Sequence, residues 1–166
     1  MNAYQIFCHW YALACAVVGT IDIADNFAST LTMDCRIDGV ERDYLKISVH
    51  ELPTLFKHWA ARNLHTVDEV LQDDSIMGLE ESTRFGNLAE ELCRNRIFFV
   101  TEAGRLGLGN VGVRPGGLVY LIQGLGTPSI VDVESSESIF RGTCYVNGLM
   151  DVNSITVGDS VYVALV

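Results

Sequence analysis

The sequence predicts an α+β fold in which N-terminal helices pack on a small antiparallel C-terminal β-barrel or strongly bent sheet. Up to residue 96, apolar residues recur every three or four positions, which is typical of amphipathic helices. Beyond residue 100, where most of the 15 glycines and two of the three prolines lie, apolar residues come in short runs separated by turns. No Pro/Ser-rich linker divides the 166 residues, so we expect a single domain over 1–166, with a helical part at 1–96 and a β part at 97–166.

The first predicted helix, Ile6–Ala24, is the most apolar segment of the chain. Gly19 weakens its pattern, so we expect a bend there. The segment contains His9 and Asp22, its uninterrupted apolar run is shorter than the ~18–20 residues that cross a bilayer, and no basic residue precedes it. The segment is therefore predicted to be a buried helix, with no membrane insertion.

Three further helices are predicted before residue 96. Pro53 suits the first turn of a helix over Ser48–Asn63. Thr66 and Glu69 form a capping box for a short helix, Val67–Gln72, which ends at a polar segment that includes Gly78. The last helix is expected at about Glu80–Arg94.

The β part contains several short apolar runs bounded by turn residues. The candidate strands are Ile97–Thr101, Arg105–Leu108, Leu118–Gln123, Ser129–Val133, Ile139–Val146 and Ser160–Leu165.

Composition excludes several classes of partner. The chain carries 11 Lys and Arg against 21 Asp and Glu, for a net charge of −10, without a basic cluster that could bind nucleic acid or an anionic membrane surface. Its 5 cysteines are an odd number without a CxxC pair. We therefore expect reduced thiols and a cytoplasmic protein.

Three groups of residues imitate ligand sites. The segment from Gly107 to Gly112 spells GxGxxG, but Pro115 follows where a dinucleotide site needs a helix, so we expect these glycines to permit positive φ in turns. His50, His58 and His65 are not spaced as metal ligands on a helix. Asp22 and Asp25 share a helix face but are more simply solvated. No metal and no cofactor are predicted.

The segment 96–109 reads RIFFVTEAGRLGLG. It resembles an Arg-Phe-Phe-x-Thr-Glu run ending in Gly-x-Leu-Gly-Leu-Gly, which lies in the region that follows the HET domain in fungal heterokaryon-incompatibility (HET) family proteins. Three later stretches agree in order: RPG at 114–116, PSIV at 128–131 and GTCYVNGLMD at 142–151. The chain departs from the pattern at Gly117, Asp132 and Asn147, where the family tends to have Asp, Arg and His. The resemblance implies the family's C-terminal module without its TIR-like HET domain.

Two functions of different classes remain open. The first is a cofactor-independent cyclase or isomerase of the pericyclase type in fungal natural-product biosynthesis, because stand-alone HET-like proteins resemble reading frames found among such genes. This chemistry needs only an apolar cavity that holds a small apolar organic substrate and a few hydrogen bonds to a carbonyl. The second is a HET-type interaction or regulatory module that uses the first helix, which includes self-association as a homodimer.

The candidate site residues follow from the first hypothesis. Aromatic residues would shape the cavity, and polar residues would donate to a carbonyl. The predicted catalytic residues are His9, Tyr120, Tyr145 and Asn147, and the predicted substrate-binding residues are Trp10, Tyr11, His58, Trp59 and Gln123. A closed cavity with converging polar groups would favour the enzyme, whereas a filled core with an exposed apolar stripe on the first helix would favour the module.

Overall fold

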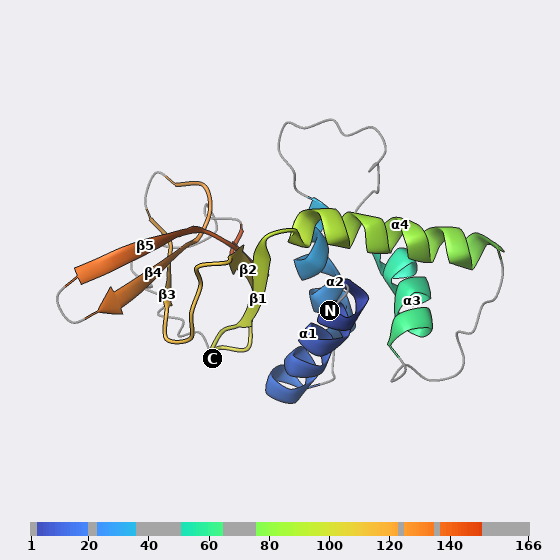
Figure 1. Ribbon diagram of the computed structural model, residues 1–166, viewed down its shortest axis with the longest axis horizontal. Coiled ribbons are helices and arrows are strands. Elements are labelled where there is room, and N and C mark those ends of the chain that lie inside the picture. Colours follow the sequence, from blue (N-terminus) through green and yellow to red (C-terminus); the bar gives the residue numbers. More distant parts are fainter. Residues whose placement is uncertain are drawn as a thin grey trace. The chain divides into compact units, whose positions relative to one another are not determined.

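The computed structural model describes residues 3–19, 23–35, 51–64, 76–122, 125–134 and 137–150 (Figure 1). Within it, the helical half of the chain forms its own compact unit. The described residues before β1 (Arg96–Val100) form four helices, α1 (Ala3–Val18), α2 (Ile23–Thr32), α3 (Leu52–Asn63) and α4 (Ile76–Cys93), with a 3-10 turn at Met33–Cys35. The predicted helix Val67–Gln72 lies outside the described residues.

The predicted bend at Gly19 is a helix end. α1 stops at Val18, and Gly19 adopts a φ of +95°, a conformation that ends helices because only glycine reaches it without strain. α3 carries Pro53 in its first turn, as expected. α4 begins at Ile76, earlier than expected, and includes Gly78, which the sequence pattern places in the polar segment before the helix.

The helical unit has an aromatic core. Phe7 and Ala14 are the buried residues of α1, and α2 adds Ile23, Phe27 and Leu31. The two in α1 are seven residues apart and those in α2 recur every four residues, so each set lies on one buried helix face. Trp59 of α3 and Phe85 of α4 are fully buried.

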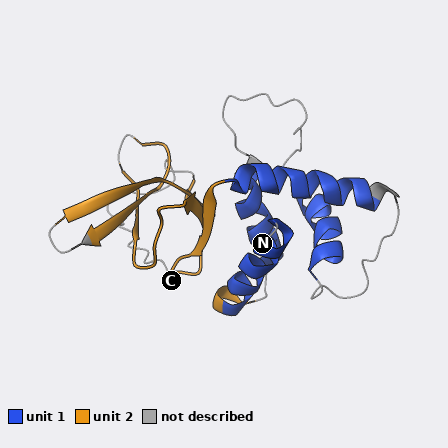
Figure 2. Ribbon diagram, viewed as in Figure 1, with its two compact units in different colours: residues 1–16, 20–94 blue, residues 17–19, 95–166 orange. Residues whose placement is uncertain are grey.

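Asn95 marks the change from helix to strand. Its φ of +58° places it in the left-handed region that commonly follows a helix end, and β1 (Arg96–Val100) begins at the next residue. Figure 2 shows the resulting division into one unit of residues 1–16 and 20–94 and a second of residues 17–19 and 95–166. The predicted single domain with helices packed on the sheet stays a prediction.

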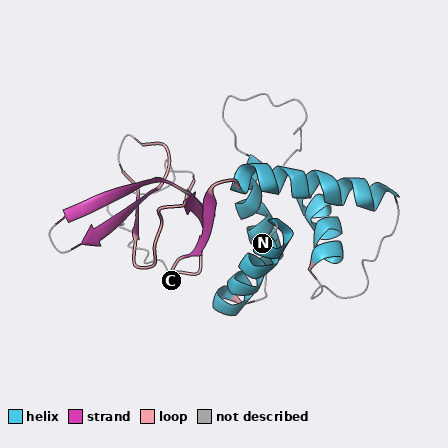
Figure 3. Ribbon diagram, viewed as in Figure 1, coloured by secondary structure: helices cyan, strands magenta, loops and turns pink. Residues whose placement is uncertain are grey.

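The described strands of the second unit form two three-stranded antiparallel sheets, so the α+β class is confirmed and a closed barrel is not what they form (Figure 3). One sheet has the order β1-β2-β6, with β2 at Leu106–Asn110 and β6 at Tyr145–Val146. The other has the order β3-β4-β5, with β3 at Leu118–Tyr120, β4 at Ser129–Glu134 and β5 at Glu137–Thr143. The predicted strand Ser160–Leu165 lies outside the described residues.

The predicted strand Ile139–Val146 is divided between the two sheets. Gly142 has a φ of +121°, and a bulge between Ile130 and Val131 shifts the β4–β5 register beside it. Cys144 belongs to neither strand, and the chain then joins the other sheet as β6. Bulges and glycines bend strands and let them change sheets. Neither feature interrupts the pattern of apolar residues, so that pattern alone predicts one continuous strand.

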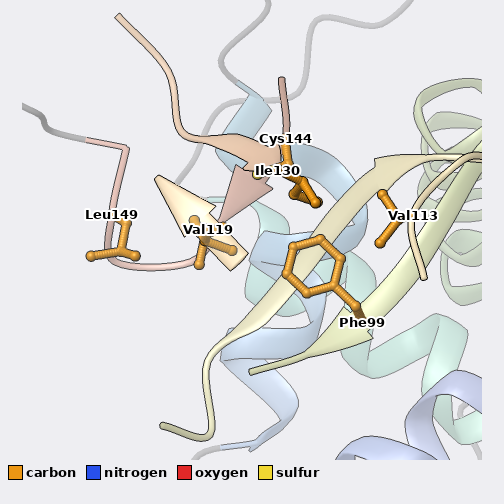
Figure 4. Packing of buried hydrophobic residues seen from close by; sticks show 7 residues of the cluster. Phe99, Val113, Val119, Ile130, Cys144 and Leu149 are labelled. Atoms are coloured by element: carbon orange, nitrogen blue, oxygen red, sulfur yellow. The ribbon is translucent and has the colours of Figure 1, made fainter. Parts of the chain in front are cut away.

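Both sheets contribute to the core of the second unit (Figure 4). The labelled side chains of Phe99, Val119 and Ile130 come from β1, β3 and β4. The buried cluster consists of Phe99, Val113, Val119, Ile130, Cys144, Val146 and Leu149.

Candidate functional site

Trp59 lies at the centre of an aromatic cluster in the helical unit. Its ring centroid is 5.5 Å from that of Phe85, 5.9 Å from that of Phe56 and 6.1 Å from that of Phe7. The side chain is fully buried, and centroids 4.5–7 Å apart are those of ordinary aromatic packing. The predicted substrate contact of Trp59 is therefore filled by protein rings over most of its surface.

Trp10 and Tyr11 lie at the margin of this cluster. The Trp10 ring is 5.6 Å from Phe7, the Tyr11 ring is 5.1 Å from Phe27, and both residues are half-buried. Burial raises the pKa of the Tyr11 hydroxyl, and the neighbouring Cys15 raises it further. His9, on the same helix, is exposed.

His58 connects two helices. Its Nε2 lies 2.9 Å from Glu81 Oε2 of α4, and both side chains are largely buried. This contact is sufficient to hold the imidazole in place, so His58 is accounted for as a link between α3 and α4.

The remaining predicted residues belong to the β unit. Tyr145 is buried in β6, while Tyr120 and Asn147 are half-buried. The backbone of Asn147 donates to the Leu106 carbonyl at 2.9 Å, and its own carbonyl accepts from Arg105 Nη1 at 3.3 Å. Gln123 lies outside the described residues. The structure thus groups His9, Trp10, Tyr11, His58 and Trp59 in one unit and Tyr120, Tyr145 and Asn147 in the other.

The glycines of the GxGxxG segment have a structural role that differs from the expected one. None of Gly107, Gly109 and Gly112 has a positive φ, and the first two lie within β2, paired with β1. A Cβ at Gly107 would collide with the Phe99 ring and would lie 2.8 Å from the Tyr145 carbonyl oxygen. A Cβ at Gly109 would lie 2.6 Å from Val113 Cγ2. Gly107 and Gly109 are therefore required by the close packing of side chains on the strand, a role that does not follow from turn chemistry.

A buried ion pair in the β unit was not predicted. Arg141 Nε of β5 donates to Asp132 Oδ2 of β4 at 2.6 Å, and Asp132 is 8% exposed. The side-chain amide of Asn110 donates to the Arg141 carbonyl, and Asn110 Oδ1 accepts from the backbone N–H of Gly112 at 3.0 Å. The pair and the amide fasten the bulged end of β5. Asp132 and Arg141 carry opposite charges and lie nine residues apart across a hairpin, and this spacing is the sequence signal that could have predicted the ion pair.

A second unpredicted group is the indole N–H of Trp59, which has no hydrogen-bond partner among the described residues. A Cβ built on Gly86 of α4 would lie 3.4 Å from Trp59 Nε1, 3.5 Å from Trp59 Cδ1 and 3.5 Å from the Tyr4 hydroxyl oxygen. The N–H edge of the ring thus packs against α4 at Gly86. An isolated glycine inside a helical pattern was the available signal.

The part of the chain that the structure describes contains no group of three or more His, Cys, Asp or Glu side chains that could hold a metal ion. The helices of the described ranges include none whose length and apolar character would suit a membrane crossing. Four described cysteines, Cys8, Cys15, Cys93 and Cys144, are not joined in disulfides.

Comparison with protein-family models, with curated proteins and with solved structures finds no match to this chain. The resemblance to HET-family proteins therefore stays a prediction.

Proposed function

We propose that this chain is a non-enzymatic interaction module that self-associates through one face of α1. This outer face consists of Gln5, His9, Ala12, Leu13, Ala16 and Val17, all of which are exposed. The observation that supports the proposal is that α1 exposes this face without a single Asp, Glu, Lys or Arg in 16 residues. Leu13 is 38% and Val17 43% exposed.

The other helices of the same unit have outward faces of the ordinary kind. α3 exposes Lys57 and Arg62, and α4 exposes Glu80 and Glu90. Charged outward faces keep a helix hydrated, whereas an uncharged apolar face is typical of a surface that meets another protein. The difference lies between helices of one unit, so it does not reflect the composition of the chain as a whole.

A second copy of this chain is the occupant that the charges favour. Two copies with a net charge of −10 repel each other, and an uncharged face is where they can approach at the least electrostatic cost. A two-fold dimer brings each face against its own copy, so the face needs to complement only itself. Ala12 and Ala16, four residues apart, have short side chains that allow two helices to approach closely.

The test is the oligomeric state of the full chain by sedimentation equilibrium. We expect the wild type to form a dimer, and Leu13→Glu to raise the dissociation constant by about a hundredfold because a carboxylate would be desolvated in the interface. Leu79→Glu is the matched control, because Leu79 is 54% exposed on α4 and lies outside the face. A wild type that stays monomeric up to about 100 µM, or equal weakening by both substitutions, would contradict the proposal.

The cofactor-independent cyclase or isomerase remains a second candidate, for which Trp10, half-buried at the margin of the aromatic cluster beside Phe7, is a residue that a substrate could still reach. Its substrate would be a small apolar organic molecule. Mass spectrometry after incubation with polyketide and terpene precursors tests it. On that hypothesis Tyr145→Phe and Asn147→Ala slow turnover and leave thermal stability nearly unchanged, whereas equal loss of both would make these residues structural.

For both candidate functions, we propose that the chain is a HET-related module located in a reducing compartment such as the cytoplasm. The free thiols support this location, because Cys8 and Cys15 are half-buried and would meet oxidants outside the cell.

A further inference from the structure

The sheet of β3, β4 and β5 has two different faces. Successive residues of a strand point to opposite faces, and Val119 and Ile130, which are paired in the register, belong to the buried face. The opposite face holds Val131, which the register pairs with Leu118 on one side and with Phe140 on the other. This outward face is therefore apolar across all three strands, whereas the solvated face of an antiparallel sheet normally carries polar residues.

Two side chains of the outward face are well exposed. Phe140 is 57% and Val133 53% exposed. They are diagonal neighbours, because Val133 lies two residues beyond Val131, the partner of Phe140, and such pairs are within reach of an aromatic ring. β4 and β5, which carry them, lie side by side as a hairpin (Figure 1). Adjoining apolar side chains at the surface are typical of a site that meets another chain.

β5 lies at the end of this sheet among the described strands. A strand in that position turns every second backbone N–H and C=O away from its neighbour. Near Arg141 and Gly142 this edge lies against Asn110, whose side-chain amide donates to the Arg141 carbonyl. The rest of the strand, residues 137–140, has exposed or half-buried side chains. An edge of this kind accepts an extended peptide as an added strand.

The charges of the hairpin determine which peptide fits. Asp132 and Arg141 neutralise each other in their ion pair. Glu137 is exposed, and its partner in the register is Glu134, so two acidic residues occupy opposite positions at this end of the hairpin. Like charges in opposite positions repel each other, and a basic residue on an added strand would offset that repulsion. The charge pattern therefore favours a peptide that places Lys or Arg beside Glu137.

We propose that residues 137–140 of β5 bind an extended basic segment of another protein as an added antiparallel strand. Glu137 and Phe140 are three residues apart, so they point to opposite faces of the sheet. The added strand places an apolar residue opposite Phe140 and, three positions later, a Lys or Arg opposite Glu137. This surface goes beyond the proposed self-association, because it belongs to the β unit and shares no residue with the outer face of α1.

The experiment uses the full chain and the synthetic peptide Thr-Val-Thr-Val-Lys-Thr, labelled with a fluorophore at its N-terminus and amidated at its C-terminus. In the proposed register its first valine lies opposite Phe140 and its lysine opposite Glu137. Fluorescence anisotropy should show saturable binding with a dissociation constant of about 50 µM, because the interface is small. The control peptide Thr-Val-Thr-Val-Glu-Thr should bind about tenfold more weakly, since its carboxylate meets a carboxylate.

Three substitutions separate the site from its surroundings. Glu137→Lys should weaken binding of the lysine peptide about tenfold and make the glutamate peptide the tighter of the two. Glu102→Lys is the matched control, because Glu102 is exposed in the same unit, lies outside the hairpin and gives the same change in net charge. Phe140→Thr should weaken the lysine peptide about fivefold. Leu13→Glu should leave peptide binding unchanged, so a failure of dimerisation is distinguishable from a failure of this site.

The backbone contribution is tested by N-methylation of the peptide. Only every second N–H of an added strand faces its neighbour. Methylating both valines and methylating the lysine with the threonine before it should therefore differ, and one of the two should abolish binding.

Three results would overturn the proposal. The first is the absence of saturable binding of the lysine peptide up to about 1 mM. The second is an equal loss of affinity with Glu137→Lys and Glu102→Lys, which would mean a general attraction between a basic peptide and an acidic chain. The third is an equal effect of the two methylated peptides, which would mean that the peptide does not pair with β5 as a strand.

Discussion

The two units use glycine in opposite ways. In the helical unit, Gly86 faces atoms no closer than 3.4 Å to the position of its missing Cβ, so a methyl group fits. In the β unit, a methyl group on Gly107 would collide with the Phe99 ring, and one on Gly109 would lie 2.6 Å from Val113. The helical glycine therefore tolerates a methyl group, whereas the strand glycine covered by an aromatic ring is required for stability.

The cores of the two units also differ in how tightly side chains pack around their glycines. The helical core is built from large rings on four helices, and among its described residues the buried indole N–H of Trp59 has no hydrogen-bond partner. The β core closes over its glycines, with Phe99 lying on the strand opposite them. An aromatic side chain that covers a cross-strand glycine restores the contacts which the glycine lacks.

The largest expected difference concerns thiol reactivity. Burial raises the pKa of Cys144 to about 12, against an ordinary value of 9.0, although the nearby Arg96 lowers it. Because the thiolate is the reactive form, we expect iodoacetamide at about pH 8 to modify Cys144 roughly a thousandfold more slowly in the folded chain than in urea. Peptide mapping by mass spectrometry measures both rates.

The same shift has a consequence for stability. The folded pKa of Cys144 lies above the unfolded one, so its contribution is fully present below pH 9 and is lost as the pH rises toward 12. Cys144→Ser should flatten the fall of the unfolding free energy in that window. An unchanged slope would mean that the thiol is not shielded.

Gly107→Ala is the next largest change. The added methyl must displace the Phe99 ring and approach the Tyr145 carbonyl, which we expect to destabilise the β unit by about 3 kcal/mol. Urea unfolding followed by circular dichroism measures the loss. Gly126→Ala is the control, since no atom lies within 4 Å of its added methyl, and it should change stability by less than about 0.5 kcal/mol. Equal effects would refute close packing on β2.

Arg141→Ala removes one partner of the ion pair with Asp132. The carboxylate would remain largely buried, and we expect a loss of about 2 kcal/mol in the unfolding free energy. Asp132→Asn in the same chain should restore part of it, because the amide carries no charge to desolvate. A double-mutant cycle measured by urea unfolding would show no coupling if the pair is solvated.

The sequence predicted element types better than element ends. The helical faces of Phe7 and Ala14 in α1, and of Phe56 and Trp59 in α3, follow directly from spacing, and both sets are buried. The division of the predicted strand at Cys144 did not follow, because a bulge and Gly142 redirect the chain without altering the apolar pattern. Local patterns carry no record of which sheet a strand joins.

The candidate site was harder to predict than the fold. Aromatic residues were assigned to a cavity, yet Trp59 is enclosed by Phe7, Phe56 and Phe85, because the same residue types that line pockets also fill cores. The place of Gly86 beside Trp59 and Tyr4 depends on contacts between α1, α3 and α4. Such contacts join residues far apart in sequence, and no spacing rule predicts them.

Gly86→Ala has the smallest expected effect on stability and the opposite sign. Alanine favours the helix interior over glycine by about 0.5–1 kcal/mol, and its methyl meets Trp59 and Tyr4 only at ordinary contact distance. We therefore expect α4 to gain up to about that amount, measured as a higher urea midpoint with an unchanged slope. A gain in stability would show that the packing around α4 does not require a glycine at position 86, in contrast to position 107. A loss of stability would instead place Gly86 with Gly107, as a glycine required by a filled core, and the contrast between the two units would disappear.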